Sequence, residues 1–220
     1  MHDVVTNIIT LRRGWRVTVN DQETINLSHA EMRAFPLIKG EPFDFETYKQ
    51  NLLLHQYPMA LNRAVGLLAL RARSTTELAR RLHDHGYLPE TIEMVLYKLE
   101  HEKLTDDVAF AKTWVEQRAA RGLGKARLLQ ELRVKGIQDD HATAALDALD
   151  TETTDAQAMQ LAMKLLKRHG ALSAQEKRRK AIAAMQRRGY GYGEAARALS
   201  AADAESETPV DMMDDDSYTD

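Results

Sequence analysis

Residues 74–99 read STTELARRLHDHGYLPETIEMVLYKL, and residues 124–149 read GKARLLQELRVKGIQDDHATAALDAL. The second stretch repeats the apolar and glycine pattern of the first after a fixed interval. The matching positions are Leu78, Leu82, Gly86, Tyr87, Ile92, Leu96 and Leu99 in the first stretch and Leu128, Leu132, Gly136, Ile137, Ala142, Leu146 and Leu149 in the second. A fixed period is typical of small helical units that bury their apolar faces by stacking on copies of themselves. We therefore predict tandem helical repeats.

Each repeat is predicted to contain three helices. Residues 61–68 carry apolar side chains at helical spacing, which indicates the first helix. Ser74, with Glu77 three residues later, predicts a capping box at the start of the second helix. Gly86 can take the left-handed conformation that ends this helix, and Pro89 fits the first turn of the third.

A third repeat follows once an insertion is allowed. Ser173 and Glu176 repeat the capping pattern, and Gly189 repeats Gly86. Thirteen residues separate Glu176 from Gly189, whereas nine separate Glu77 from Gly86. The difference of four is close to one helical turn, so the apolar face stays in register.

The predicted fold class is mainly α, with tandem three-helix repeats that form a curved array. Thr105 is the expected N-cap of the second repeat, and the carboxylates of Asp106 and Asp107 suit the positive end of its first helix. The expected organisation is a β-rich N-terminal module at 1–43, a connecting helix at 44–58, repeats at 59–103, 104–150 and 154–200, and a disordered acidic tail at 201–220.

The N-terminal module has the alternating pattern of strands. Two short strands are predicted to join near Arg13 and Gly14, with a third at residues 24–27. Residues 28–35 are expected to form a short helix, and residues 37–42 a loop. We favour a role as a packing cap on the first repeat over an independent binding role.

Composition narrows the class of protein. Of the 220 residues, 44% are hydrophobic and none is cysteine, so disulfides and thiolate metal sites are excluded. No apolar run approaches the roughly 20 residues that span a bilayer. The first residues lack the basic and apolar regions of a secretory signal. We expect a protein of the cytoplasm without membrane association.

Charge is distributed unevenly along the chain. Lys and Arg total 30, Asp and Glu total 33, and residues 201–220 hold eight of the acidic residues and none of the basic ones. The rest of the chain is therefore basic. We favour a solubilising role for the tail. The alternative is that the tail mimics nucleic acid and competes for the basic surface.

Catalytic patterns are incomplete. Residues 122–125 read GLGK, but Ala119 stands where a phosphate loop needs glycine, and Ala126 stands where it needs Ser or Thr. We expect a loop between helices there. His83 and His85 are two residues apart and point to different sides of a helix. We predict no enzyme activity, no metal and no cofactor.

Two basic clusters remain as candidate binding residues. The first contains a single acidic residue, Glu131, and its basic members are Arg118, Arg121, Lys125, Arg127, Arg133 and Lys135. The second contains only Glu176 as an acid, and its basic members are Lys167, Arg168, Lys177, Arg178, Arg179, Lys180, Arg187 and Arg188. Each cluster alone is equally explained as a solvated helix face. Two clusters at related positions favour a surface that binds phosphates or an acidic protein groove.

The central sequence closely resembles the RecX family of bacterial recombination regulators. The resemblance is carried by residues 104–111 (LTDDVAFA), 118–132 (RAARGLGKARLLQEL) and 135–137 (KGI), and residues 60–87 resemble the first repeat of that family. It covers residues 59–149 well and 155–199 more loosely. The N-terminal module resembles an extension of some longer members, and the acidic tail lies outside the pattern.

This resemblance implies a non-catalytic protein that binds in the groove of RecA filaments on DNA. It further implies restraint of the ATPase, strand-exchange and co-protease activities of RecA, in DNA repair, recombination and the SOS response. The expected partners are RecA, its nucleoprotein filament, and single- or double-stranded DNA. The protein itself is expected to be a monomer. Gly86, Gly136 and Gly189 are expected to be hinges of the fold and not contact residues.

Two other functions stay open. One is a stand-alone DNA-binding protein that uses a helix pair as a helix-turn-helix reader. Against it, the apolar stripes are committed to packing, and no helix offers a row of Arg, Asn and Gln for base edges. The other is a helical scaffold for a different partner, which requires the basic clusters to be incidental.

Overall fold

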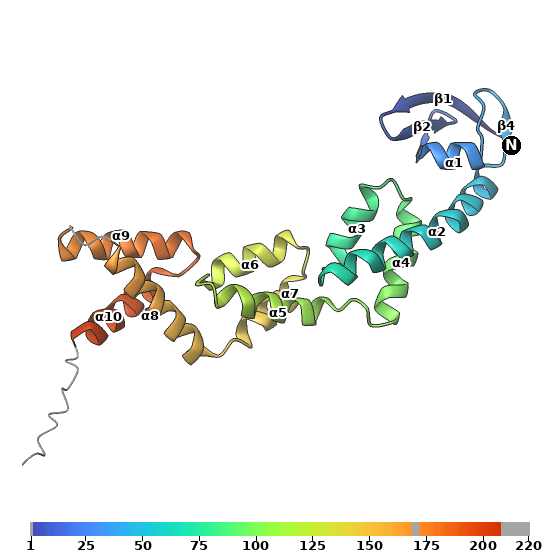
Figure 1. Cartoon of the computed structure of the whole chain (residues 1–220). Helices are drawn as coiled ribbons and strands as arrows, with labels where there is room; N and C mark the ends of the chain where they lie inside the picture. Colours follow the sequence, from blue (N-terminus) through green and yellow to red (C-terminus); the bar gives the residue numbers. More distant parts are fainter. Residues whose placement is uncertain (1, 169–171, 208–220) are drawn as a thin grey trace, which may run out of the picture. The chain divides into compact units, whose positions relative to one another are not determined.

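The computed structural model describes residues 2–168 and 172–207, which contain four strands and ten helices (Figure 1). The chain divides into two compact units, residues 1–110 and residues 111–220. The first unit contains the N-terminal module, and both units are otherwise helical. The predicted mainly helical fold, with a small β-rich module at the N-terminus, is confirmed.

A four-stranded antiparallel sheet forms the N-terminal module. Its strands are β1 (Asp3–Leu11), β2 (Gly14–Val19), β3 (Glu23–Leu27) and β4 (Pro42–Phe43), in the order β3-β2-β1-β4. The hairpin at Arg13 and Gly14 is confirmed. The short strand β4 was not predicted, because Pro42 lies in a stretch with the composition of a loop.

Alternate residues of the sheet face the core of the module. Val5, Val17 and Leu27 are almost fully buried. They pack with α1 (His29–Ala34) and the first half of α2 (Phe45–Leu70). Ser28 and Glu31 form a complete capping box at the start of α1, which confirms the predicted short helix.

Helix α2 runs without a break from the module into the first repeat. The connecting helix expected at 44–58 and the first helix of the first repeat are thus one continuous helix, whereas the sequence pattern predicts them as separate. An internal proline costs about 3 kcal/mol because it removes one hydrogen bond of the helix. Leu52 is buried on one side of Pro58, and Ala60 and Ala64 are buried on the other. This burial offsets the cost of the proline and keeps the helix continuous.

Gln56 of α2 joins the module to the first repeat. Its amide oxygen accepts hydrogen bonds from the Leu88 N–H at 2.8 Å and the Thr91 hydroxyl at 3.0 Å. Its amide nitrogen donates to Glu31 Oε1 at 2.7 Å. Gln56 is fully buried, so the loss of any of these three hydrogen bonds would leave a buried polar group unsatisfied. The module packs on the first repeat, as the cap interpretation predicts.

The remaining helices follow the predicted pattern of the repeats. They are α3 (Thr75–His83), α4 (Pro89–His101), α5 (Asp107–Ala119), α6 (Lys125–Val134), α7 (Asp139–Asp147), α8 (Thr151–Lys167), α9 (Ala174–Arg187) and α10 (Tyr192–Glu207). The expectation of disorder from residue 201 is wrong for residues 201–207, which extend α10. Ala202 is buried there, and Asp203 binds Arg178 at 2.8 Å. Residues 208–220 lie outside the described residues.

The second helix of each repeat ends in the same left-handed turn. Gly86, Gly136 and Gly189 have φ values of 90°, 74° and 90°. The residue after each glycine donates its N–H to a carbonyl five positions back, as from Ile137 to Leu132 at 3.1 Å. These bonds satisfy carbonyls that the helix end leaves free, and the predicted turns are confirmed.

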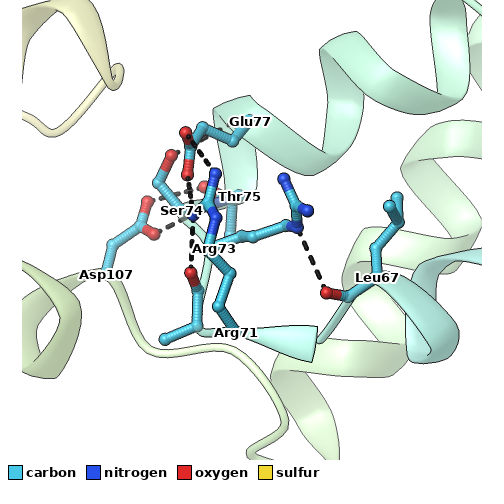
Figure 2. Close-up of polar contacts among 8 residues, drawn as sticks. Leu67, Arg71, Arg73, Ser74, Thr75, Glu77 and Asp107 are labelled. Atoms are coloured by element: carbon cyan, nitrogen blue, oxygen red, sulfur yellow. Dashed lines mark hydrogen bonds and ion pairs between the residues drawn. The ribbon is translucent and has the colours of Figure 1, made fainter. Parts of the chain in front are cut away.

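Figure 2 shows how the start of α5 contacts the start of α3. The Asp107 carboxylate accepts hydrogen bonds from the Thr75 N–H at 2.9 Å and the Thr75 hydroxyl at 2.6 Å. Asp106 caps α5 by accepting from the Ala109 N–H at 2.9 Å. The predicted cap at Thr105 is therefore wrong, and the Thr105 hydroxyl is buried without a hydrogen-bond partner among the described residues.

Two arginines in Figure 2 hold the turn between α2 and α3. Arg71 binds both carboxylate oxygens of Glu77, at 3.1 and 3.2 Å. Arg73 Nε donates to the Leu67 carbonyl in the last turn of α2, at 3.2 Å. Glu77 also donates its N–H to the Ser74 hydroxyl at 3.1 Å. The turn is thus fixed by charge-assisted bonds at both of its helix ends.

In the second unit, the start of α6 meets the end of α9. The N–H groups of Gly124 and Ala126 donate to the carbonyls of Arg188 and Gly189, at 2.9 and 3.2 Å. A Cβ on Gly124 would overlap the Gly189 carbonyl group. Gly189 therefore packs against the start of α6 in addition to forming the turn after α9.

We expect Gly124→Ala to destabilise the second unit by about 2–4 kcal/mol, because two backbone hydrogen bonds would be strained or lost. Gly124 has φ −82°, so alanine is allowed there by backbone conformation and the cost is steric. Urea unfolding measures the change. Gly66→Ala is the matched control, because nothing lies within 4 Å of a Cβ at this position of α2. The control should stabilise by up to about 1 kcal/mol. Equal effects of the two substitutions would contradict the steric account.

Lys103 offers a second test of the left-handed turns. It has φ 56°, and the next residue, Leu104, donates its N–H to the Leu99 carbonyl at 2.8 Å. The left-handed conformation costs a residue with a side chain roughly 1–2 kcal/mol. We expect Lys103→Gly to raise the free energy of unfolding by about 1 kcal/mol. Thermal unfolding measures this, with Lys112→Gly inside α5 as a control that should destabilise.

Candidate nucleic-acid and partner interface

Ion pairs occupy part of the first predicted cluster. Arg118 of α5 binds Glu131 of α6 through two hydrogen bonds, at 2.5 and 2.7 Å. The Trp114 indole N–H donates to the same carboxylate at 3.2 Å, and Lys135 Nζ lies 4.0 Å from the centre of the Trp114 ring. The Arg118 bond holds the pKa of Glu131 below its usual range. Arg118 and Lys135 therefore serve mainly to pack α5 on α6.

Two other arginines of the first cluster have acidic neighbours. Arg133 pairs with Asp139 through two hydrogen bonds at 2.8 and 3.2 Å, which lowers the pKa of Asp139. Arg127 Nε lies 3.6 Å from Glu131, and its guanidinium also donates to Gln130 at 3.0 Å. Solvent screens such exposed pairs, so they contribute little to stability. Arg127 and Arg133 are thus only partly neutralised.

Arg178 of the second cluster is a structural residue. Its guanidinium binds Asp203 and the Ser200 hydroxyl, each at 2.8 Å, and the Ala196 carbonyl at 3.3 Å. All three partners lie on α10. Arg178 therefore fastens α10 to α9, and sequence reasoning missed this because Asp203 was counted with the acidic tail.

The other candidates are available for binding. Within residues 2–168 and 172–207 they form no ion pair with a carboxylate, and all of them except the half-buried Lys177 are exposed. They are Arg121, Lys125, Lys177, Arg179, Lys180, Arg187 and Arg188, together with Lys167 and Arg168 from the wider cluster.

The structure brings four of these residues to one place. Arg121 and Lys125 flank the turn between α5 and α6, and Arg187 and Arg188 end α9. The backbones of these two segments are joined by the hydrogen bonds of Gly124 and Ala126 described above. Arg188 Nη1 also lies 3.4 Å from the Arg121 carbonyl. We call Arg121, Lys125, Arg187 and Arg188 the junction surface.

Lys180 extends the junction surface along α9. Lys180 and Arg187 are seven residues apart, so they lie on nearly the same face of the helix and about 10 Å apart along its axis. Lys177 and Arg179 lie further toward the start of the same helix. Within the described residues, no hydrogen bond or ion pair joins their side chains to the turn between α5 and α6, and we therefore keep them separate from the junction surface.

The loop at residues 122–125 lies between α5 and α6, as predicted. In the described part of the chain, no group of three or more His, Asp or Glu side chains could hold a metal ion. A cavity of about 170 Å³ adjoins the junction, and its lining includes Lys125, Tyr190 and Arg197. Burial raises the pKa of Tyr190. None of the helices described is both long enough and apolar enough to cross a bilayer.

Sequence comparisons identify the helical part of the chain. Three family models match it: "RecX, first three-helix domain" at residues 60–99, the second such domain at 106–146 and the third at 153–199. Regulatory protein RecX of Amycolatopsis mediterranei (strain U-32) is 35% identical over 139 residues, which are 63% of this chain and 79% of that protein. Regulatory protein RecX of Bacillus subtilis (strain 168) is 28% identical over 192 residues, 86% of this chain and 73% of that protein.

Solved structures share the fold. A crystal structure of regulatory protein RecX has a TM-score of 0.63 and 21% identity, and the match covers 90% of this chain and 99% of that chain. RecX from Lactobacillus salivarius has a TM-score of 0.64 and 22% identity, with 69% and 99% covered. Together with the matched domains and relatives, this confirms the resemblance noted from the sequence: the chain belongs to the RecX family.

Proposed function

We propose that the protein is a non-catalytic regulator of RecA recombinase. It binds RecA and the RecA filament on single-stranded DNA, as a cytoplasmic monomer, and restrains ATPase, strand exchange and co-protease activity. Membership of the RecX family supports this proposal, since the curated relatives are named regulatory proteins. The contact is assigned to the second unit, where the junction surface lies.

The junction surface is the observation that carries the proposal. Arg121 and Lys125 are more than 60 positions from Arg187 and Arg188 in the sequence, yet the fold joins their segments by backbone hydrogen bonds. Four exposed cations that form no ion pairs with the described carboxylates create a positive potential at this point. A phosphate backbone or an acidic protein groove would relieve their mutual repulsion. The DNA within a RecA filament carries such phosphates.

Stand-alone DNA reading by a helix-turn-helix fits the structure less well. In such readers, the first residues of the recognition helix contact base edges. Here α4 begins with Pro89 and Glu90, and α7 begins with Asp139 and Asp140. Carboxylates at these positions would repel the phosphates that flank the groove. The test below includes DNA binding without RecA as an outcome of its own.

Replacing Arg121, Lys125, Arg187 and Arg188 together with alanine should weaken the action on RecA at least tenfold. The measurement is the single-stranded-DNA-dependent ATPase of the cognate RecA, with the protein well below the RecA concentration. Contacts to single-strand phosphates each contribute about 0.7 to the slope of log affinity against log salt. In a measurement of affinity for single-stranded DNA at several salt concentrations, the magnitude of this slope should therefore fall by up to about 3 if all four residues contact phosphate.

The matched control replaces four exposed basic residues outside the junction surface, Arg12, Arg13, Lys112 and Lys164, with alanine. It removes the same charge and should retain at least half of the inhibition. Equal losses in both variants would mean that net charge, and not the junction surface, governs binding. Tight DNA binding by the parent protein without any effect on RecA ATPase would instead favour a stand-alone DNA-binding protein.

A further inference from the structure

A groove between α8, α9 and α10 has no role in the proposed filament contact. It has a volume of about 740 Å³. Met163 and Leu166 of α8 form part of its lining and are only partly buried. Ala202 and Ser206 line it from the last turns of α10. The groove therefore has an apolar part, formed by Met163, Leu166 and Ala202, beside the end of the described chain.

Basic side chains lie on the lining of this groove. Lys167 ends α8, and Lys177 lies in the first half of α9. Neither forms an ion pair with a described carboxylate. Arg178 also lines the groove but is already bound to Asp203. A ligand for this groove must combine apolar groups with negative charge.

The chain itself supplies such a segment immediately after α10. Residues 210–216 read VDMMDDD, with Val210, Met212 and Met213 among four aspartates. Methionine is flexible and polarisable, and it fills irregular apolar surfaces well. Residue 210 is four positions beyond Ser206, so the intervening chain can span up to about 14 Å. The segment therefore starts within reach of the groove.

Helix α10 already uses the same chemistry against α9. Asp203 forms its ion pair with Arg178 while Ala202 and Leu199 are buried against α8 and α9. Apolar residues alternating with a carboxylate thus anchor the last described turns. The sequence at 210–216 continues this combination with more charge, and the remaining cations, Lys167 and Lys177, lie in the same groove.

We propose that residues 210–216 of this chain bind in the groove between α8, α9 and α10. Val210, Met212 and Met213 cover Met163 and Leu166, and the aspartates neutralise Lys167 and Lys177. The segment is tethered beside the groove, so its effective concentration is in the millimolar range and weak contacts are sufficient. Charge complementarity and the place where α10 ends identify this occupant over a segment of another protein.

Docking has a consequence that rests on the proposed function. The docked segment adds negative charge beside Lys177 of α9. Lys180 and Arg187, which lie further along the same helix, lead from there to the junction surface. It therefore lowers the affinity of the second unit for phosphates. If the segment is docked about 90% of the time and excludes DNA, the apparent affinity falls about tenfold.

Paramagnetic labelling can test the docking without RecA or DNA. The chain has no cysteine, so Ser217→Cys gives a single site for a nitroxide label on the full-length protein. We expect strong loss of NMR signal at Met163, Leu166 and Ala202, and little at Arg121 and Lys125. No loss at the groove, or equal loss at the groove and the junction surface, would overturn the proposal.

A charge-matched variant separates docking from general attraction. Val210→Ser, Met212→Ser and Met213→Ser together keep every aspartate, and these residues lie outside the described helices. Docking predicts that the signal loss at the groove disappears in the labelled triple variant. Signal loss that persists unchanged would show that charge alone holds the segment near the surface, which contradicts the proposal.

Binding assays then test the consequence separately. Truncation after Glu207 and the triple serine variant should both raise the affinity for single-stranded DNA several-fold at low salt. An increase after truncation only would contradict docking through apolar contacts and would leave charge repulsion as the cause. Failure of the DNA and ATPase assays in all variants, with the groove signals still lost, would overturn the proposed function and not the docking.

Discussion

The fold depends on satisfying the backbone groups at the ends of many short helices. A helix leaves four N–H groups and four carbonyls without internal partners, and these groups are numerous because the described part of the chain contains ten helices. The left-handed turns at Gly86, Gly136 and Gly189 satisfy carbonyls at the end of each second helix. Each turn lies in a connection of four or five residues, which lets the third helix pack on the second. Each three-helix repeat is therefore a consequence of one backbone conformation.

The contacts between successive repeats satisfy the free backbone N–H groups at the N-terminal ends of helices. The first turn of α3 receives the Asp107 carboxylate, and the first turn of α6 receives the Gly189 carbonyl. In both cases the N-terminus of a second helix is bound by a group from the following repeat. A carboxylate is used where Ser74 also caps the helix, whereas bare carbonyls are used where Gly124 has no side chain to offer. Stacking of repeats is thus specified by polar contacts as well as by apolar burial.

Local signals made much of this fold predictable from the sequence. The glycine turns, the serine caps at Ser74 and Ser173, and the hairpin at Gly14 each depend on residues close together in the chain. Predictions failed where a distant contact decides the outcome: packing on both sides of Pro58 overrides its tendency to break a helix. Likewise, the basic clusters can be recognised in the sequence, but which of their members are bound in ion pairs cannot. Arg178, for example, meets its partner Asp203 only through the packing of α10 on α9. The junction surface could not be predicted for the same reason, because its residues are far apart in the sequence and come together only in the folded chain.

Helix α2 belongs to two cores, with Phe45 and Leu52 buried in the sheet module and Ala60 and Ala64 buried in the first repeat. The module and the repeat consequently have no separable boundary, although their sequences look unrelated. During evolution, such a module cannot be gained or lost by joining a coding segment at the repeat boundary. It has to arrive with the first half of α2 and with a residue such as Gln56, whose amide is shared by both parts. In physical terms the N-terminal module is an extension of the first repeat and not an interchangeable domain.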